Sequence, residues 1–463
     1  MSPKTIDSSR VKILNNANIR DGDHVLYWMQ QSQRAEYNHA LEYAVQQANG
    51  LGQGVLVIFG LMDDYPEANL RHYTFMLEGL QETMKTLAGR GIKMLVRKGH
   101  PVDVVSAASQ KASLVVCDQG YLRHQKAWRN RVARQSKRRV VQVESDVIVP
   151  VEVVSDKAEY AARTIRPKIH RHLEKYLSKL TPTPVKHPTV DLNLKSLEIQ
   201  NTSAVLKTLQ VDRSVAAASR FFKGGTSQAK KRFTDFMRCG LAKYDDHSNQ
   251  PQTDDISHMS PYLHFGHISP LYLALEVKKA GSRRQAAKDA YMEELVVRRE
   301  LAMNFANYVN KYDAFDCVPQ WAQKTLARHE KDKREHIYTR KQLEDAQTHD
   351  EYWNAAMREM RYTGFMHNYM RMYWGKKIIE WSKTPQQAFK TTLALNNKYF
   401  LDGRDPNSFT GVAWLFGVHD RAWTERPVFG KIRWMAASGL ERKCDIQAYV
   451  RKVDALVKRA LSA

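Results

Sequence analysis

Short apolar runs alternate with longer amphipathic stretches over the first third of the chain. Five such runs are rich in Val, Leu, Ile and aromatic residues, at 25–29, 55–59, 92–96, 113–117 and 140–144. Strands that are apolar on both faces are typical of a parallel sheet covered by helices. The stretches 33–49 and 67–90 are long enough to be the crossover helices of βαβ units. The pattern therefore predicts an α/β domain at residues 1–155.

The pattern changes after this region. Residues 181–215 begin with TPTPVKHP and continue with small and polar residues, which is typical of a connector on the surface. We predict that the whole connector between the two domains spans residues 156–215. Beyond it, apolar residues recur at helical spacing, as between 290 and 310, and strand signals nearly vanish. We therefore expect an all-α second domain at 216–463. The predicted fold class is α/β plus all-α.

Composition and charge narrow the class of protein. The chain has 463 residues, of which 43% are hydrophobic and 26% charged, as expected of a folded globular protein. No apolar run reaches the ~18 residues of a membrane span, and the N-terminus has no secretory pattern. We expect an intracellular protein with no membrane partner. A formal charge of +23 favours a polyanionic partner, nucleic acid first, although a chain that is basic only for solubility stays an alternative.

Metal and hydrolytic chemistry lack a candidate in the sequence. The four cysteines are scattered without a CxxC pair, and neither His170-x-His172 nor His264-x-x-His267 has a carboxylate or thiolate at ligand spacing. GxSxG is also absent. We therefore predict no metal site and no hydrolase.

Aromatic and basic residues are concentrated in particular segments. Seven of the nine tryptophans lie between 321 and 434. Trp374 and Trp381 are seven apart and would share a helix face, a spacing that suits electron transfer, although plain core packing is an alternative for each. Two segments, 121–139 and 220–238, combine Lys and Arg with aromatic residues, as phosphate binding and base stacking require. A solvated helix face remains the alternative.

Several motifs together resemble the class II cyclobutane pyrimidine dimer (CPD) DNA photolyases of the photolyase/cryptochrome family. They occur in the family's order and span nearly the whole chain: YWM (27–29), QRAE (33–36), SPYLHFGHISP (260–270), EELVVRREL (293–301), HIYT (336–339), MRMYWGKKIIEW (370–381), LNNKYFLDGRDPN (395–407) and VHDRAW (418–423).

The resemblance implies a Rossmann-like antenna domain and a helical FAD-binding catalytic domain. It implies an enzyme, a deoxyribodipyrimidine photo-lyase, in which photoexcited, reduced, anionic FAD passes an electron to a dimer flipped out of double-stranded DNA. The enzyme is expected to be a monomer. For the antenna chromophore, the resemblance to this class favours 8-hydroxydeazaflavin, with a folate, or no chromophore at all, as the alternatives. Two alternatives remain: a cryptochrome-like blue-light photoreceptor without repair, and a DNA-binding flavoprotein that has lost turnover.

The resemblance also assigns residues to FAD. Five residues resemble the family's segment that binds the FAD phosphates: Tyr244, Ser257, His258, Met259 and Ser260. Arg371 and Asp402 resemble an ion pair beside the isoalloxazine, with Gly403 in the same loop. Asn396 matches an asparagine that faces flavin N5, where an amide can bond either protonation state.

Other positions resemble residues for the lesion and for electron transfer. Glu294 matches an acid that contacts the carbonyl oxygens of the dimer and needs a raised pKa to donate a hydrogen bond. Four residues resemble those of the family's lesion pocket: Tyr338, Met372, Trp414 and Arg421. Three tryptophans resemble those of its path of photoreduction: Trp374, Trp353 and Trp381. The chain departs from the family pattern at Ser248, Arg298 and Asn368 and in the six residues between Trp414 and Arg421.

Overall fold

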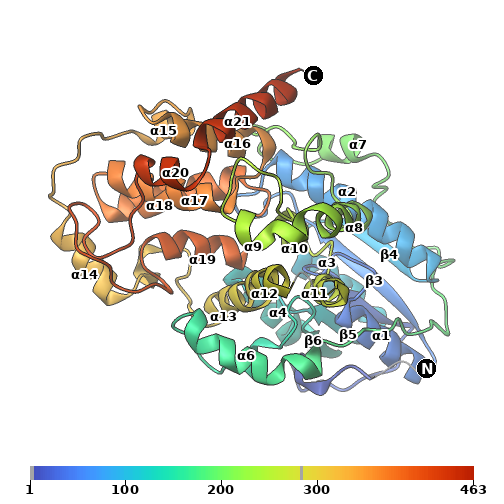
Figure 1. Cartoon of the computed structure of the whole chain (residues 1–463). Helices are drawn as coiled ribbons and strands as arrows, with labels where there is room; N and C mark the ends of the chain where they lie inside the picture. The colour runs from blue at the N-terminus through green and yellow to red at the C-terminus, as the bar shows by residue number, and fades with distance from the viewer. Residues whose placement is uncertain (1–4, 282–284, 463) are drawn as a thin grey trace.

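The computed structural model describes residues 5–281 and 285–462, and its N-terminal part is built on a six-stranded sheet (Figure 1). The strand order is β1-β6-β5-β2-β3-β4, and all neighbours are parallel except β1 and β6. The strands are β1 (Val11–Ile13), β2 (His24–Trp28), β3 (Gly54–Leu61), β4 (Lys93–Lys98), β5 (Ala112–Asp118) and β6 (Arg139–Val143). The predicted α/β domain with a mainly parallel sheet is confirmed.

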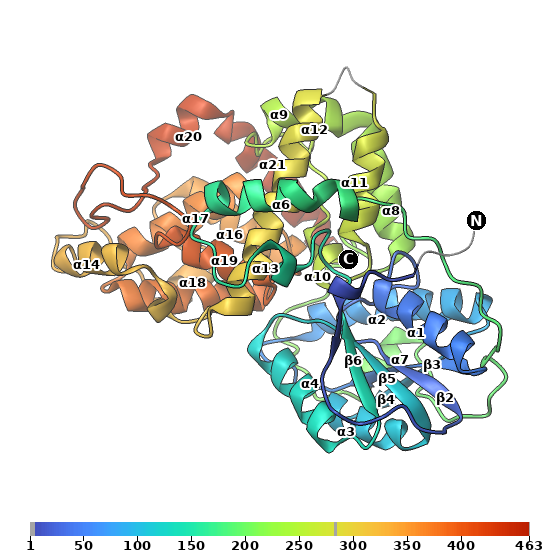
Figure 2. The ribbon, with the colours of Figure 1, turned by 90° about the horizontal axis from the view of Figure 1, so that it is seen from below.

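Helices cover both faces of this sheet (Figure 2). Alternate residues of β2 point to opposite sides: Tyr27 packs with α1 (His39–Gly50) and α2 (Leu70–Gly89), while Trp28 packs with α3 (Pro101–Ala108) and α4 (Arg123–Gln135). Both faces of the sheet are therefore buried, which explains why the strands are continuous apolar runs. The short edge strand β1 was not predicted, because it has three residues of which two are exposed.

The remainder of the described chain is helical, as predicted. In the connector, residues such as Ile199 and Val211 pack against the sheet domain, and the predicted domain limits at 155 and 215 stay a prediction. The α-helices are α5 (Val151–Val154), α6 (Ala162–Tyr176), α7 (Thr202–Lys207), α8 (Thr226–Asp235), α9 (Tyr244–His247), α10 (Ser260–His264), α11 (Pro270–Lys279), α12 (Gln285–Met292), α13 (Arg299–Tyr308), α14 (Gln320–Arg328), α15 (Arg340–Glu344), α16 (Glu351–Thr363), α17 (Asn368–Trp381), α18 (Pro385–Tyr399), α19 (Pro406–Leu415), α20 (Ala437–Lys443) and α21 (Ile446–Leu461).

Two turns of π-helix interrupt these helices. The helical pattern at 290–310 is divided into α12, the π-helical segment η6 (Glu293–Arg298) and α13. A second such segment, η3 (Phe236–Gly240), follows α8. An extra residue in a helical turn re-aims the side chains beside it, and π-helical turns are frequent at functional sites. Glu294 lies on η6, so its direction depends on this irregularity.

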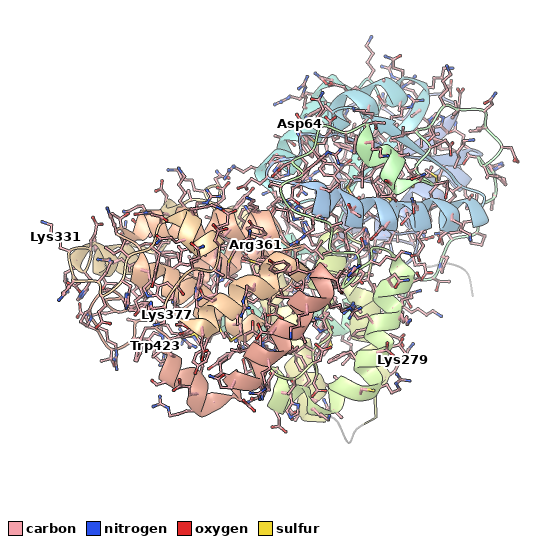
Figure 3. All side chains as sticks on the ribbon, turned by 90° about the horizontal axis from the view of Figure 1, so that it is seen from above. Asp64, Lys279, Lys331, Arg361, Lys377 and Trp423 are labelled. Atoms are coloured by element: carbon pink, nitrogen blue, oxygen red, sulfur yellow. The ribbon has the colours of Figure 1, made fainter. Side chains whose placement is uncertain are left out.

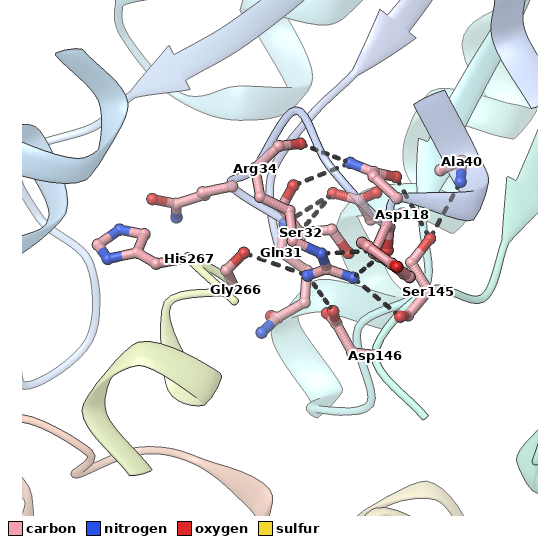
Figure 4. A network of polar contacts seen from close by, with 12 residues as sticks. Gln31, Ser32, Arg34, Ala40, Asp118, Ser145, Asp146, Gly266 and His267 are labelled. Atoms are coloured by element: carbon pink, nitrogen blue, oxygen red, sulfur yellow. Dashed lines mark hydrogen bonds and ion pairs between the residues drawn. The ribbon is translucent and has the colours of Figure 1, made fainter. Parts of the chain in front are cut away.

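The sheet part and the helical part lie side by side, with Asp64 in the first and Trp423 in the second (Figure 3). A buried polar network joins them (Figure 4). Arg34 binds Asp146 at 2.7 Å and donates to the carbonyl oxygen of Gly266 at 3.1 Å. Gly266 has φ of +68°, and a Cβ there would lie 2.1 Å from the Gln31 carbonyl oxygen. The close approach of these two loops fixes how the helical part sits against the strand ends.

Candidate functional site

Three tryptophans form a continuous array inside the helical part. The Trp353 ring, from α16, is parallel to that of Trp374 at 12° and 6.5 Å between centroids, and it meets the Trp381 ring edge-on at 5.5 Å. Its indole N–H donates to the Trp374 carbonyl oxygen at 2.9 Å. All three side chains are buried. Trp353 therefore lies between the two tryptophans of α17, an arrangement suited to stepwise electron transfer.

Tyr338 lies at the outer end of this array. Its ring meets that of Trp381 edge-on at 5.3 Å, and its hydroxyl is 2.6 Å from Nδ1 of His349. Its ring contacts in the described chain are therefore with Trp381 and two histidines, His336 and His349. The role in the lesion pocket stays a prediction, and these contacts give it no support.

Arg371 and Asp402 form the predicted ion pair. One guanidinium nitrogen of Arg371 lies 2.9 Å from Oδ1 and 3.1 Å from Oδ2 of Asp402, and the guanidinium carbon is 3.7 Å from the centroid of the Phe400 ring. A cation over an aromatic face is held in place by the ring quadrupole. The pair therefore fixes Arg371 of α17 against the loop that joins α18 to α19.

The same loop brings Gly403 against Asn396. A Cβ at Gly403 would lie 2.9 Å from the Asn396 carbonyl oxygen, so only glycine fits. The buried side chain of Asn396 donates to Asn397 at 2.9 Å and to Ser408 at 2.7 Å. Its amide oxygen is then the atom left to accept a hydrogen bond from a ligand.

The segment predicted to bind FAD phosphates lies beside Tyr244. The Tyr244 ring meets that of Tyr291 edge-on at 5.3 Å, and Ser257 hydrogen-bonds Tyr291. His258 has φ of +54°, binds Asp254 at 2.9 Å and packs against Phe365. Met259 is buried and Ser260 begins α10.

Buried polar atoms without a partner test whether these residues fit FAD. Such atoms are rare in proteins, and each one points to a missing partner. Within the described chain they include Nδ1 of His258, Nε2 of His367 and Nε1 of Trp374. Burial lowers the pKa of His367 to about 3, so its ring is neutral and can bond an uncharged group. Such an atom lies on or next to each of three predicted features: the FAD segment, the Arg371–Asp402 pair and Trp374. The residues therefore fit FAD.

Glu294 lies on η6 with an exposed side chain. Desolvation by the surrounding protein raises the pKa of its carboxyl, with Arg298 opposing the shift and Glu293 adding to it. Burial is the main cause that raises the pKa of Tyr244, and the charge of Glu294 is the second. The carboxylate of Glu294 therefore lies near the predicted FAD segment.

Trp414 and Arg421 lie in one cluster of cations and aromatic rings. The Trp414 ring has Lys376 at 5.3 Å and Arg433 at 5.4 Å from its centroid, and Arg421 lies 5.2 Å from that of Trp423. Met372 is half-buried and packs against the same core as Trp414. Lys376, which the sequence did not single out, is buried, and burial lowers its pKa to about 7.

The two basic segments singled out in the sequence contribute some internal contacts, while most of their lysines and arginines are exposed or half-buried. In 121–139, Arg129 is buried against Gln142 and Arg123 binds Asp313. In 220–238, Phe233 is buried in the core. Charge pattern alone could not separate these internal contacts from a DNA surface, because Lys and Arg stems pack while their ends find partners.

A pocket opens at the carboxyl ends of the strands. It lies beyond the ends of β2 and β3, between α2, the start of α4 and residues 404–406. The neighbouring position between β2 and β5, where the strand order reverses, is the usual ligand site of an open parallel sheet. The empty space of the pocket, which includes the part open to solvent, is ≈ 720 Å³. Two buried polar atoms without a partner, Oε1 of Gln33 and Nε of Arg404, belong to lining residues, as do the rings of Tyr65 and Trp128.

The fold and these residues define a class of flavin-dependent, light-using proteins: a sequence model of the DNA photolyase family matches residues 25–188, and the chain belongs to this family. It is 46% identical over 98% of its length to the deoxyribodipyrimidine photo-lyase of Methanothermobacter thermautotrophicus, covering 99% of that protein. It is 38% identical to the enzyme of that name from Potorous tridactylus, over 96% of this chain and 85% of the relative.

Solved structures share the fold. An archaeal photolyase from Sulfolobus tokodaii with two FAD molecules has a TM-score of 0.70 at 14% identity, covering 94% of this chain and 93% of that one. A class III photolyase from Agrobacterium tumefaciens has a TM-score of 0.69 at 18% identity, covering 95% and 87%.

The relatives confirm the sequence-based predictions of the photolyase/cryptochrome family and of an enzyme of the photo-lyase type. The family binds FAD and acts on DNA. Among residues 5–281 and 285–462, no helix combines the length and the apolar character that a bilayer crossing requires.

Proposed function

We propose that this protein is a class II CPD photolyase, which splits pyrimidine dimers in double-stranded DNA. The observation that carries the proposal is Glu294, a carboxyl with a raised pKa whose charge acts on Tyr244 of the predicted FAD segment. A protonated carboxyl can donate a hydrogen bond, which an ionised one cannot. Near-full-length similarity to deoxyribodipyrimidine photo-lyases supports the same reaction.

Each residue then has a defined task. Arg371, Asp402 and Asn396 hold the flavin, which supplies a photoexcited electron donor when bound and reduced. Glu294 donates its proton in a hydrogen bond to a dimer carbonyl oxygen and stabilises the charge that develops there. Trp414 gives the dimer an aromatic face, and Arg421 takes the space of the flipped bases, a step that costs least for a poorly stacked lesion.

A photoreceptor without repair is not favoured. The cluster of Trp414, Arg421, Trp423 and Arg433 combines stacking surfaces with cations, as binding of exposed bases and phosphates requires. A signalling protein that never opens a duplex has no need for this arrangement.

Replacing Glu294 tests the proposal. Glu294→Ala removes the donor and should lower the quantum yield of dimer repair by about five- to thirtyfold, the effect of losing about 1 to 2 kcal/mol. Glu294→Gln keeps an N–H donor and should retain more activity. Repair is measured under blue light with a dimer-containing duplex, and FAD content by absorbance. Loss of FAD in both variants would make Glu294 structural, and full activity of Glu294→Ala would refute its role.

The raised pKa of Glu294 leads us to expect that dimer repair depends on pH. The pKa of Glu294 is raised in the folded chain, so its protonated form persists above the usual range of a glutamic acid and is lost as pH rises through the folded pKa. Repair should therefore fall as pH rises. Glu294→Gln has no proton to lose, so its profile should lack this fall.

We also propose that the pocket beyond the ends of β2 and β3 holds the antenna chromophore. Its lining is aromatic and, apart from Arg404, has no lysine or arginine. A folate carries a glutamate carboxylate that favours several cations, so the lining favours the tricyclic ring of 8-hydroxydeazaflavin, which has no carboxylate. The unpartnered oxygen of Gln33 would accept a hydrogen bond from it.

Gln33→Leu should weaken deazaflavin binding by about two- to tenfold, the effect of one hydrogen bond of about 0.5 to 1.5 kcal/mol. FAD content and repair at wavelengths that FAD itself absorbs should not change. Fluorescence titration with 8-hydroxydeazaflavin and with a folate measures both affinities. Tighter binding of the folate would reverse the proposed choice, and equal affinity of Gln33→Leu and the unmodified protein would remove Gln33 from the site.

A further inference from the structure

Three residues proposed to bind the lesion, Arg421, Trp423 and Arg433, lie on one long loop, residues 418–434, which has no helix and only one isolated bridge, between Arg426 and Gly430. Arg421 and Arg426 are exposed on it, whereas Val428 and Phe429 are buried. A loop with so little regular structure keeps its shape through its contacts with the body of the protein. Those contacts converge on the end of α14.

His329, the residue that follows α14, connects the loop to the helix. Its Nδ1 lies 2.6 Å from Oδ2 of Asp332, and its Nε2 lies 3.0 Å from Oε1 of Glu425 in the loop. A neutral imidazole has only one N–H, so it can donate to one carboxylate at most. Two carboxylates on the two ring nitrogens therefore require the doubly protonated, cationic ring.

The backbone of the loop is held at the same place. Asp332 accepts the N–H of Val428 at 2.8 Å, and Thr325 of α14 accepts that of Lys431 at 3.0 Å. Gly430 has φ of +54°, and a Cβ there would lie 2.2 Å from the Thr325 hydroxyl and 3.0 Å from the His329 ring. Only glycine at position 430 therefore allows the loop to lie this close to His329.

We propose that His329 is a positioning residue for lesion binding: its cationic ring bridges Asp332 and Glu425 and holds the 418–434 loop against α14, so that Arg421 and Trp423 face the DNA. This rests on the proposed function of that loop. When the ring loses its proton, one of the two carboxylate contacts becomes repulsive, and the loop is released from the helix.

The charged groups around the ring fix the direction of the pH dependence. Hydrogen bonds that the His329 ring donates to Glu425 and Asp332 raise its pKa, and burial opposes this shift. Arg328 and Lys431 pair with Glu425 as well, and Arg334 lies near Asp332. Because the folded pKa is raised, the stabilisation is fully present below the unfolded value of about 6.5 and is lost as pH rises through the folded pKa.

Hydrogen–deuterium exchange of the loop tests this without DNA. Rates for a peptide covering 423–434, corrected for the intrinsic effect of pH, should rise in the unmodified protein between about pH 5.5 and about pH 8.5. His329→Gln should exchange fast at every pH. His329→Lys, which stays charged, should be protected at every pH. His170→Gln, an exposed histidine on α6, is the matched control and should behave as the unmodified protein.

Dimer-specific binding in the dark is the second readout. The ratio of Kd for undamaged and dimer-containing duplex should fall by about three- to tenfold in His329→Gln, and its pH dependence should vanish in His329→Lys. Protection of the loop that is independent of pH, or unchanged in His329→Gln, would overturn the proposal. If the unmodified protein does not prefer dimer DNA, the proposed function fails, while the exchange data still decide the role of His329.

Discussion

Replacing Trp353 with Phe should slow the light-driven reduction of bound oxidised flavin by more than about tenfold, which corresponds to more than about 1.4 kcal/mol of barrier. Trp353 contacts both Trp374 and Trp381, so it is the middle member of the array. A phenyl ring fills much of the same space but is far harder to oxidise than an indole. Electrons arriving from Trp381 would then have no intermediate step to Trp374. Trp374→Phe should give the same block.

The measurement is the bleaching of oxidised flavin under blue light with an excess of thiol. Trp321→Phe is the control, because Trp321 is half-buried against Gly417 and has no ring contact with the array. Dimer repair by chemically reduced Trp353→Phe should stay near that of the unmodified protein. Unchanged bleaching would show that another route reduces the flavin, and loss of bound FAD would show that Trp353 is needed for the pocket.

The tryptophan array shows what periodicity can and cannot predict. A spacing of seven placed Trp374 and Trp381 on one face of a helix, and both lie on α17. Periodicity within one helix could not show that Trp353 of α16 would come between them, because that contact joins positions far apart in the chain. Only the resemblance to a family associated the three residues.

The sheet was predicted more completely than the pocket on it. Apolar runs located five of the six strands within a few residues, because burial on both faces leaves a continuous signal. The pocket residues are polar groups just past strand ends, such as Gln31 and Gln33 after β2. The available signal was the reversal of strand order, which depends on pairing and not on composition.

Irregular elements were the least predictable. The π-helical turn at Glu294 has the same apolar period as its neighbours, so nothing local marks it. The 418–434 loop has few strand or helix signals, and its shape depends on His329 and Thr325, about a hundred positions earlier.

Asp402→Ala should abolish most FAD retention and reduce the free energy of unfolding by about 1 to 3 kcal/mol. The side chains of Asp402 and Arg371 are 10% and 21% exposed, so removing the carboxylate leaves a partly buried guanidinium without its counter-charge. The cation stays above the Phe400 ring but is free to turn away from the loop that carries Gly403. FAD absorbance after gel filtration and unfolding in urea measure the two effects.

The matched control for this change is Asp316→Ala, which removes an exposed ion pair with Lys311 and should cost no more than about 1 kcal/mol, with FAD retained. Asp402→Asn separates charge from hydrogen bonding, because an amide oxygen can still accept from Arg371 but brings no negative charge. If Asp402→Asn binds FAD as well as the unmodified protein, orientation of Arg371 is what the flavin requires. If it loses FAD as Asp402→Ala does, the charge itself is required. Normal FAD content in both variants would contradict the assignment of the pair to the flavin site.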